Sequence, residues 1–323
     1  MTNYIIRRLF SCVLLVILVS MVIFMLIRML PGDPIDLLLP REDMIGLTAE
    51  QLQAHMDALR AEHGLDRPLP IQFGYWFINM LQGDFGRSIV RGFEVGPELA
   101  NRMAVTLFLG SLAFIFSIVF GILLGTISAI RRGKWVDTVA TAIANIGITA
   151  PAFLIAILLI YVFGFRLRLL PIFGYHLPWR GDFVQSIRQT ILPVFVLALS
   201  PMALTARQTR SSVLDVLNQD HVRTAWAKGG RERAVIFRHV LKNALTPVIT
   251  LQGNNVRLIF GGSAIIESIF VIPGVGRLLV DSMLSADYPV VQAIAVVLTL
   301  ITVIANLIVD LLYGWVDPRI QYS

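Results

Sequence analysis

The sequence predicts an all-α membrane protein with six transmembrane helices, and three observations support this fold class. Hydrophobic residues make up 56% of the 323 and charged residues only 15%, whereas soluble domains average roughly 45–50% and about 25%. Long windows without a charged residue recur along the chain, and a helix needs about 20 apolar residues to cross the hydrocarbon core. Basic residues flank these windows, as they do at membrane surfaces.

Five of the predicted spans are windows without any Asp, Glu, Lys or Arg. In chain order, they are residues 9–27, 103–130, 138–165, 189–206 and 288–309. Pro151 lies inside the third window, and Pro193 and Pro201 lie inside the fourth. Because proline removes a backbone donor, we expect these helices to bend or break there, beside a transport pathway or at a packing contact.

The sixth span, at about 244–268, precedes the last window and is the weakest by hydropathy. It contains Gln252, Asn254, Asn255, Arg257 and Glu267. An arginine at the centre of a lipid-facing helix costs roughly 2.5–3.5 kcal/mol on insertion scales. We therefore expect these polar side chains to face protein or water, as a wall of a translocation pathway or as a structural network between helices.

Six spans put both termini on one side of the membrane, and we place that side in the cytoplasm. Four segments then face inward: residues 1–8, 131–137, 207–243 and 314–323. These segments hold 14 of the 27 lysines and arginines, including every lysine. Such enrichment is typical of the cytoplasmic side.

The predicted boundaries divide the chain into three parts. A first transmembrane helix occupies residues 1–30, an extracytoplasmic segment 31–102, and a core of five helices 103–323. Arg7 and Cys12 superficially suggest a cleaved leader. The cysteine opens the apolar run instead of closing it, and no small-residue cleavage site follows. We therefore expect an uncleaved first helix.

The inner loop 207–243 carries eight basic residues and is predicted to hold a short amphipathic helix. Asp220 is expected as its N-cap and Gly229 as its stop, so residues 221–228 form about two turns. One face of this helix is apolar, since three residues recur at helical spacing: Val222, Ala225 and Trp226. Such a helix can dock into a groove on a soluble partner or rest on anionic lipid headgroups, and the residues alone leave both open.

Several classes of site are not predicted. The single cysteine excludes a disulfide framework, and the five histidines lack the spacing of metal ligands. The G-x-x-x-x-G-K-[ST] pattern is absent, so this chain does not bind ATP through such a loop. The net charge of +6 reflects basic residues beside apolar windows, which favours membrane lipid over nucleic acid as a partner. We predict no catalytic residues, no metal site and no cofactor in this chain.

Seven sequence stretches, in chain order, resemble motifs of one transporter family. They are LPGDP (residues 30–34), GDFGRS (83–88), RTAWAKG (223–229), RHVLKNALTP (238–247), PGVGRL (273–278), DYPV (287–290) and DPR (317–319). Residues 223–247 are similar to the cytoplasmic loop that couples ABC-importer permeases to their ATPases. The whole chain resembles the dipeptide and oligopeptide branch of that family.

This resemblance implies a type I ABC-importer permease bundle in the bacterial cytoplasmic membrane, with 207–243 as the coupling loop of the five-helix core. It implies four kinds of partner: a second homologous permease, two cytoplasmic ATP-binding subunits that carry ATP and Mg, an extracytoplasmic substrate-binding protein, and membrane lipid. The implied coupling residues are Asp220, Arg223, Thr224, Ala225, Trp226, Lys228 and Gly229. The predicted pathway residues are Gln252, Asn254, Asn255 and Arg257.

The implied function is ATP-driven import of short peptides. Related permeases import glutathione or nickel, and these stay open as alternatives. An ion-coupled secondary transporter is a further alternative, although acidic residues are scarce within the predicted spans. A structural or assembly protein is a third class. The sequence departs from the family pattern at Trp226, at Ala104 and at the polar group 254–257, and the last departure bears on the substrate.

Overall fold

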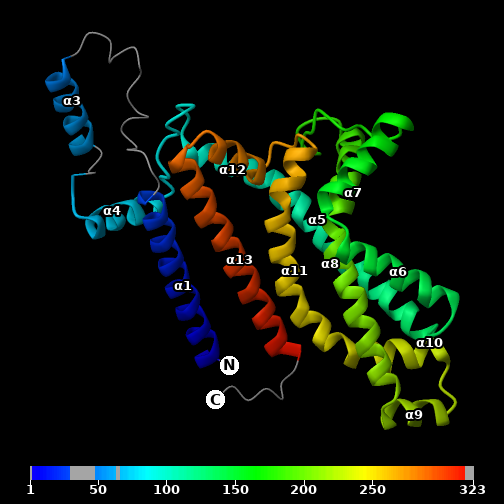
Figure 1. The fold of residues 1–323 in the computed structure, drawn as a ribbon. Helices are drawn as coiled ribbons and strands as arrows, with labels where there is room; N and C mark the ends of the chain where they lie inside the picture. The colour runs from blue at the N-terminus through cyan, green and yellow to red at the C-terminus, as the bar shows by residue number, and fades with distance from the viewer. Residues whose placement is uncertain (1, 30–47, 63–65, 317–323) are drawn as a thin grey trace. The chain divides into compact units, whose positions relative to one another are not determined.

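The computed structural model describes residues 2–29, 48–62 and 66–316. The motifs predicted at 30–34 and 317–319 lie outside these ranges. Within them, regular secondary structure is helical, and strand-like pairing is limited to an isolated bridge between Arg87 and Glu94. Figure 1 shows these helices as α1 (Thr2–Arg28), α3 (Ala49–Glu62), α4 (Leu69–Leu81), α5 (Val95–Ile130), α6 (Trp135–Thr149), α7 (Ala152–Leu159), α8 (Phe183–Leu217), α9 (Asp220–Ala227), α10 (Glu232–Val235), α11 (Lys242–Ile269), α12 (Val275–Leu284) and α13 (Tyr288–Val316).

The predicted membrane spans recur in the structure with one ambiguity. Among the described residues, four helices are long and apolar enough to cross a membrane: α1, α5, α8 and α13. The pair formed by α6 and residues 152–166 supplies a fifth span if it is counted as one. The sixth predicted span is α11, a helix of 28 residues whose polar side chains lower its hydropathy. The all-α membrane fold is therefore confirmed, and the six-helix count is consistent with it.

The prolines in the third and fourth predicted spans have different effects. Pro151 separates α6 from α7, and the two helices meet at an angle of 108°. Pro193 and Pro201 instead lie inside α8, which continues through both for 35 residues. Of the two expected outcomes, a bend or a break, the structure shows no break in the fourth span. Both prolines are buried among neighbouring side chains, so packing holds the helix together where local hydrogen bonding is lost.

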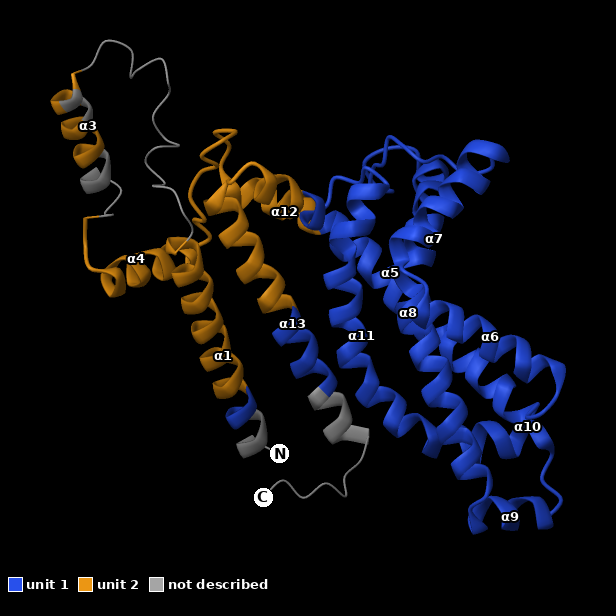
Figure 2. Ribbon diagram, viewed as in Figure 1, with its two compact units in different colours: residues 1–8, 104–277, 302–323 blue, residues 9–103, 278–301 orange. Residues whose placement is uncertain are grey.

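The chain divides into two compact units, coloured separately in Figure 2. Unit 2 comprises residues 9–103 and 278–301. In it, α1 packs against α4 through aromatic rings: the Phe24 ring lies 5.6 Å from that of Phe73 and 5.7 Å from that of Trp76. These contacts tie the first membrane helix to the segment that follows it.

Unit 1 comprises residues 1–8, 104–277 and 302–323 and holds most of the buried core. Its principal cluster joins α5, α7, α8 and α11 through residues such as Leu109, Ala156, Leu197 and Ile259. Two glycines let α5 approach α8 closely. A Cβ added at Gly121 would lie 2.6 Å from Thr205 Cβ, and one at Gly125 would lie 2.7 Å from Thr209 Cβ. The spacing of these helices therefore excludes side chains at both glycine positions.

Candidate functional site

The predicted coupling helix is present as α9, directly after the membrane helix α8. The predicted loop 207–243 is mostly helical, because its first 11 residues continue α8 to Leu217. Only Asn218 and Gln219 separate α8 from α9. Gly229 has a φ of 75°, a conformation that costs glycine little, and it follows the helix end as predicted. Any displacement of α9 therefore reaches α8 through a connection of two residues.

The start of α9 differs from the prediction. Gln219, with φ −79° and ψ 148°, is the N-cap, and it makes no side-chain capping hydrogen bond. Asp220 is the first helical residue, where its carboxylate lies near the positive end of the helix dipole without capping it. Arg223 Nη1 lies 3.7 Å from Asp220 Oδ1 on the exposed surface. The predicted N-cap role of Asp220 is therefore wrong.

The apolar face of α9 is partly buried against its own chain and partly exposed. Val222 is fully buried and Ala225 is half-buried, and both belong to a second core with residues of α8, α10 and α11. Trp226, one turn after Val222 on the same face, is 41% exposed. Arg223, Thr224 and Lys228 are exposed too. Two of the three predicted apolar residues thus fix α9 to its own chain, and Trp226 remains available to a partner.

A side-chain contact also connects α9 to the beginning of α11. Asn243 Nδ2 lies 3.3 Å from His221 Nε2 and donates a hydrogen bond to the carbonyl oxygen of His239. The segment from Glu232 to Ile269 is helical throughout, through α10, a π-helical stretch (Ile236–Leu241) and α11. The short helix α9 is therefore held by both long helices that flank it in sequence.

A buried carboxylate joins α5, α6 and α8 at the end nearest α9. Arg210 on α8 donates from Nε and Nη2 to the two carboxylate oxygens of Asp137 on α6, both at 2.9 Å. Ser128 on α5 donates to the same carboxylate, and so does the backbone N–H of Gly133. Bidentate pairing of this kind is strong and directional. We call Ser128, Asp137 and Arg210 the inner clamp.

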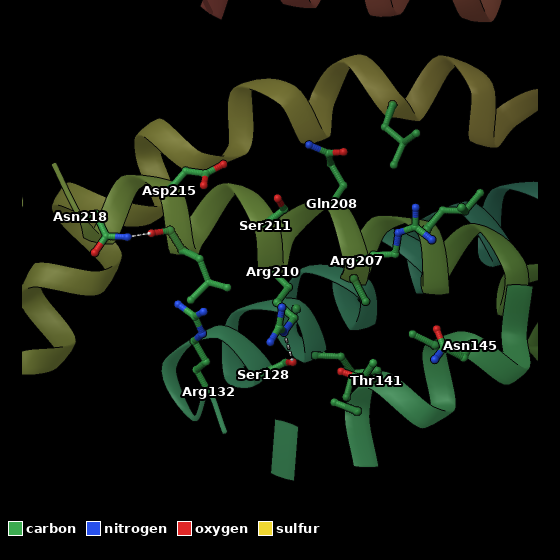
Figure 3. A pocket seen from close by; sticks show the side chains of 18 residues that line it. Ser128, Arg132, Thr141, Asn145, Arg207, Gln208, Arg210, Ser211, Asp215 and Asn218 are labelled. Atoms are coloured by element: carbon green, nitrogen blue, oxygen red, sulfur yellow. Dashed lines mark hydrogen bonds between the residues drawn. The ribbon is translucent and has the colours of Figure 1, made fainter. Parts of the chain in front are cut away.

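A cavity of about 690 Å³ opens beside the inner clamp. Figure 3 shows its polar lining, which comes mainly from α6 and α8 and from the end of α5. The labelled side chains are Ser128, Arg132, Thr141, Asn145, Arg207, Gln208, Arg210, Ser211, Asp215 and Asn218. Two members of the clamp, Ser128 and Arg210, therefore form part of the cavity wall.

The four predicted pathway residues fall on two faces of α11. Gln252 and Asn255 are buried: Asn255 Nδ2 donates to Thr205 Oγ1 on α8 at 2.9 Å and to Gln252 Oε1 at 3.0 Å. These two residues make a structural network between helices. Asn254 and Arg257 are exposed on another face. In the part of the chain that the structure describes, Arg257 has no ion-pair partner.

Exposed residues form one continuous stripe along α11. They recur every three or four positions: Asn243, Pro247, Thr250, Asn254, Arg257, Gly261 and Ile265. This spacing places them on one helical face. A Cβ added at Gly261 would meet nothing within 4 Å, so open space lies one turn beyond Arg257. The α11 stripe is therefore a polar surface on a membrane helix with room around its arginine.

A second buried carboxylate ties the far end of α11 to α5 and α12. Glu267, fully buried, accepts a hydrogen bond from Thr106 Oγ1 at 2.7 Å and from the backbone N–H of Arg277 at 3.0 Å. The Thr106 hydroxyl oxygen in turn accepts from the backbone N–H of Val275 at 2.9 Å. We call Glu267 and these donors the outer cradle.

Two glycines of the PGVGRL motif complete the outer cradle. A Cβ at Gly274 would overlap the Glu267 carboxylate, and one at Gly276 would lie 2.5 Å from Ala264 Cα. Neither residue has a positive φ, so glycine is required there by the space that the carboxylate and α11 occupy and not by the backbone conformation.

The motifs GDFGRS and DYPV meet in unit 2. Ser88 Oγ donates to Asp287 Oδ2, and the backbone N–H of Ile89 donates to Asp287 Oδ1 at 3.1 Å. Asp287 is buried, so this contact fixes the loop before α5 to the start of α13. The sequence singled out both motifs without indicating that they form one contact.

Among the described residues, no group of three or more His, Cys, Asp or Glu is arranged to hold a metal ion. Sequence reasoning missed the inner clamp and the outer cradle, which join residues 73 and 161 positions apart. The sequence contained one signal for each site. Asp137 is an acid beside the short turn 131–134, and Glu267 is an acid inside a predicted span.

Comparison with known proteins gives a consistent result. Residues 121–322 match the family model described as "Binding-protein-dependent transport system inner membrane component". Residues 1–109 match the model of the N-terminal part of such membrane components. Together the two models cover nearly all of the described helices.

Curated relatives match along the full chain. A putative peptide permease protein of Brucella suis is 41% identical, and the glutathione transport system permease protein GsiC of Escherichia coli is 40% identical, each with 100% of both chains covered. A probable peptide ABC transporter permease of Sinorhizobium fredii is 39% identical over 99% of both. A solved amino acid ABC transporter shares the fold, with a TM-score of 0.53 and 17% identity over 68% of this chain and 94% of that one.

Proposed function

The chain belongs to the family of binding-protein-dependent transport inner membrane components, and from that premise we propose that it imports short peptides. As a family member it is a multi-pass permease of the inner membrane that works within an ABC transporter, and it is a transport component rather than an enzyme. The observation that carries the peptide proposal is Arg257, an exposed cation on the α11 stripe with open space beside it.

Arg257 is placed to meet the anionic end of a peptide. At 1.5 Å per residue, a helix that enters the membrane near Thr246 reaches mid-bilayer after about ten residues. A charge there is accommodated by water or by an anionic ligand. A peptide C-terminal carboxylate fits the guanidinium geometry, and Asn254, one turn earlier on the same stripe, supplies an amide to a peptide group.

Glutathione is a second candidate, because a relative of equal similarity is named a glutathione permease. This molecule is itself a short peptide with free carboxylates, so the same arginine would serve it. Glutathione and other short peptides differ in the groups that the α11 stripe must bind besides the C-terminal carboxylate. An uptake assay in which the two compete separates these candidates.

The complex and its mechanism follow from this proposal. We place both termini in the cytoplasm, with a second homologous permease facing the α11 stripe and a substrate-binding protein delivering from outside. Two ATPases, which carry ATP and Mg, dock on α9 with Trp226 as the apolar anchor. Their closure displaces α9, the two-residue connection passes the displacement to α8, and the inner clamp shares it with α5 and α6.

Substitution of Gly229 tests this coupling. In Gly229→Asp the positive φ is strained and a charge is placed beside the docking surface, while nothing in the membrane region changes. We expect substrate-stimulated ATPase activity to fall about tenfold or more, with normal insertion. Gly92→Asp, at another glycine of positive φ with open space around it and away from the inner clamp, is the control. Normal stimulation in Gly229→Asp contradicts the coupling proposal. A cysteine at Lys228, in a background without Cys12, checks orientation because an impermeant thiol reagent should label it only after permeabilisation.

Substitution of Arg257 tests the substrate assignment. Arg257→Gln should reduce uptake of peptides with a free C-terminus roughly 10–100-fold, since a desolvated charged hydrogen bond contributes about 1.5–3 kcal/mol. Uptake of C-terminally amidated peptides of equal length should change less than about threefold. Leu258→Gln is a matched control at the neighbouring exposed position. Equal losses for free and amidated peptides would mean that the arginine is structural.

A further inference from the structure

The cavity beside the inner clamp is lined by arginines besides the one that belongs to the clamp. Three arginines and one acid line it: Arg132, Arg207, Arg210 and Asp215. Arg210 is committed to Asp137, which lies behind the wall. The side chains of Arg132 and Arg207 make no ion pair or hydrogen bond with any described residue, and both residues are exposed. The cavity therefore presents two unneutralised guanidinium groups against a single carboxylate.

The position of the cavity places these cations near a membrane surface. The apolar helix α5 ends at Ile130, and Arg132 lies in the turn that follows. Trp135, at the start of α6, is 77% exposed, and tryptophan is enriched at membrane interfaces. One end of the cavity therefore lies at the level of lipid headgroups.

The deeper end of the cavity includes apolar residues. Leu124, Ala144 and Leu204 belong to its wall, from helix segments that lie deeper along α5, α6 and α8. Figure 3 shows Arg207 on the side of Asn145 and Arg132 on the side of Asn218, with Arg210 between them in that view. Arg132 thus lies toward the membrane surface and Arg207 lies deeper, beside the apolar residues, so a headgroup held by both arginines extends along the cavity.

We propose that this cavity binds the phosphate headgroup of an anionic phospholipid. Its volume of about 690 Å³ holds a headgroup with its glycerol backbone and the first methylenes of the acyl chains. Guanidinium groups bind phosphate oxygens through paired N–H donors, and Arg132 and Arg207 are the donors that no protein acid occupies. Anionic phospholipids are present in the cytoplasmic leaflet, so phosphate headgroups are available beside the cavity.

The bound headgroup touches the elements that connect α8 to α9. Ser128 and Arg210 of the inner clamp line the cavity, and so does Asn218, the residue after α8. A phosphate in the cavity therefore stabilises the packing of α5, α6 and α8 where displacement of α9 arrives. Lipid binding is a property of this chain alone, so its test stands apart from the test of peptide transport.

The experiment measures lipid retention by the purified assembly that contains the full-length chain. The assembly is placed in nanodiscs of phosphatidylglycerol and transferred to phosphatidylcholine, and native mass spectrometry counts the phosphatidylglycerol that remains. We expect the double variant Arg132→Gln, Arg207→Gln to retain one phosphatidylglycerol fewer per chain, with retention at least tenfold weaker. Arg131→Gln removes the neighbouring arginine, which does not line the cavity, and should retain as much as the unmodified protein.

Two further arms keep the proposal falsifiable. The double variant with lysine at both positions keeps the charge and should restore most of the retention, which excludes misfolding as the cause of the loss. Glycerol 3-phosphate, added at millimolar concentration during the transfer, should displace little lipid. Equal loss in Arg131→Gln, full retention in the double glutamine variant, or complete displacement by glycerol 3-phosphate would each overturn the lipid assignment.

Discussion

The two buried carboxylates of unit 1 hold helices together in different ways. The inner clamp is built from side chains: Asp137 takes two hydrogen bonds from Arg210 and one from Ser128. In the outer cradle, Glu267 accepts from Thr106 and from a backbone N–H, and it presses against two glycines. Thr106 and Ser128 lie on the same helix, about 33 Å apart at 1.5 Å per residue.

Because of this difference, the helix contact at the inner clamp can open, whereas the contact at the outer cradle cannot. A change of rotamer at Arg210 releases α8 from α6 without moving either backbone. Release of Glu267 requires the turn 270–275 to move, because one of its two donors, the N–H of Arg277, and the Gly274 backbone beside the carboxylate belong to the main chain. We infer that the end of unit 1 near α9 rearranges during transport, while the outer cradle keeps α5, α11 and α12 as one block.

The largest expected effect comes from filling the outer cradle. In Gly274→Ala a methyl group occupies the position of the Glu267 carboxylate, which is fully buried. We expect a loss of about 3 kcal/mol in the free energy of unfolding, from overpacking and from lost hydrogen bonds. Thermal unfolding of the purified chain in detergent measures it.

Gly262→Ala is the matched control for Gly274→Ala. It lies on α11, and an added Cβ meets nothing within 4 Å. Its helical propensity should stabilise the protein slightly, by up to about 1 kcal/mol. If both alanines had the same effect, the cradle would not be a steric lock and the contrast between the two carboxylates would fail.

A smaller effect is expected at the inner clamp, and a double-mutant cycle measures it. Arg210 is 32% exposed, so solvent screens part of its interaction with Asp137. Asp137→Asn and Arg210→Gln should each cost about 1–2 kcal/mol, with a coupling energy near 1 kcal/mol in the cycle. Additive losses would mean that the bidentate pair does not act as a unit.

The clamp variants should also separate transport from stability. We expect substrate-stimulated ATPase activity to fall more in Arg210→Gln than in Thr106→Val, although Thr106 is the more deeply buried residue. The reason is that the clamp lies on the route from α9, and the cradle does not. The opposite order would place the moving joint at the outer end.

Much of the fold was predictable because long apolar windows without charged residues identify membrane helices. The windows ending at Ile130 and at Phe165 correspond to α5 and to the bent pair α6 and α7, and α9 lies within one residue of its predicted bounds. The Asp220 cap was wrong because Gln219 adopts the extended conformation instead. The helix does not break at Pro193 and Pro201, because burial of α8 outweighs two lost hydrogen bonds.

The site was predictable in part. Helical periodicity on α11 could have separated Gln252 and Asn255 from Asn254 and Arg257, since each pair is three residues apart and the pairs face different directions. The clamp between Asp137 and Arg210 is set by how α6 packs on α8. No local pattern specifies that packing, so a single sequence could not supply it.

The length of α8 has a mechanical consequence. Its 35 residues extend about 52 Å, well beyond the roughly 30 Å of the hydrocarbon core. The tight contacts of Thr205 and Thr209 with α5 act as a fulcrum with unequal arms, about 15 Å toward Leu217 and about 36 Å toward Phe183. A tilt of about 5° about that point moves Leu217 by about 1 Å and Phe183 by about 3 Å. The helix is a lever that multiplies a small push at one membrane surface into a larger opening at the other.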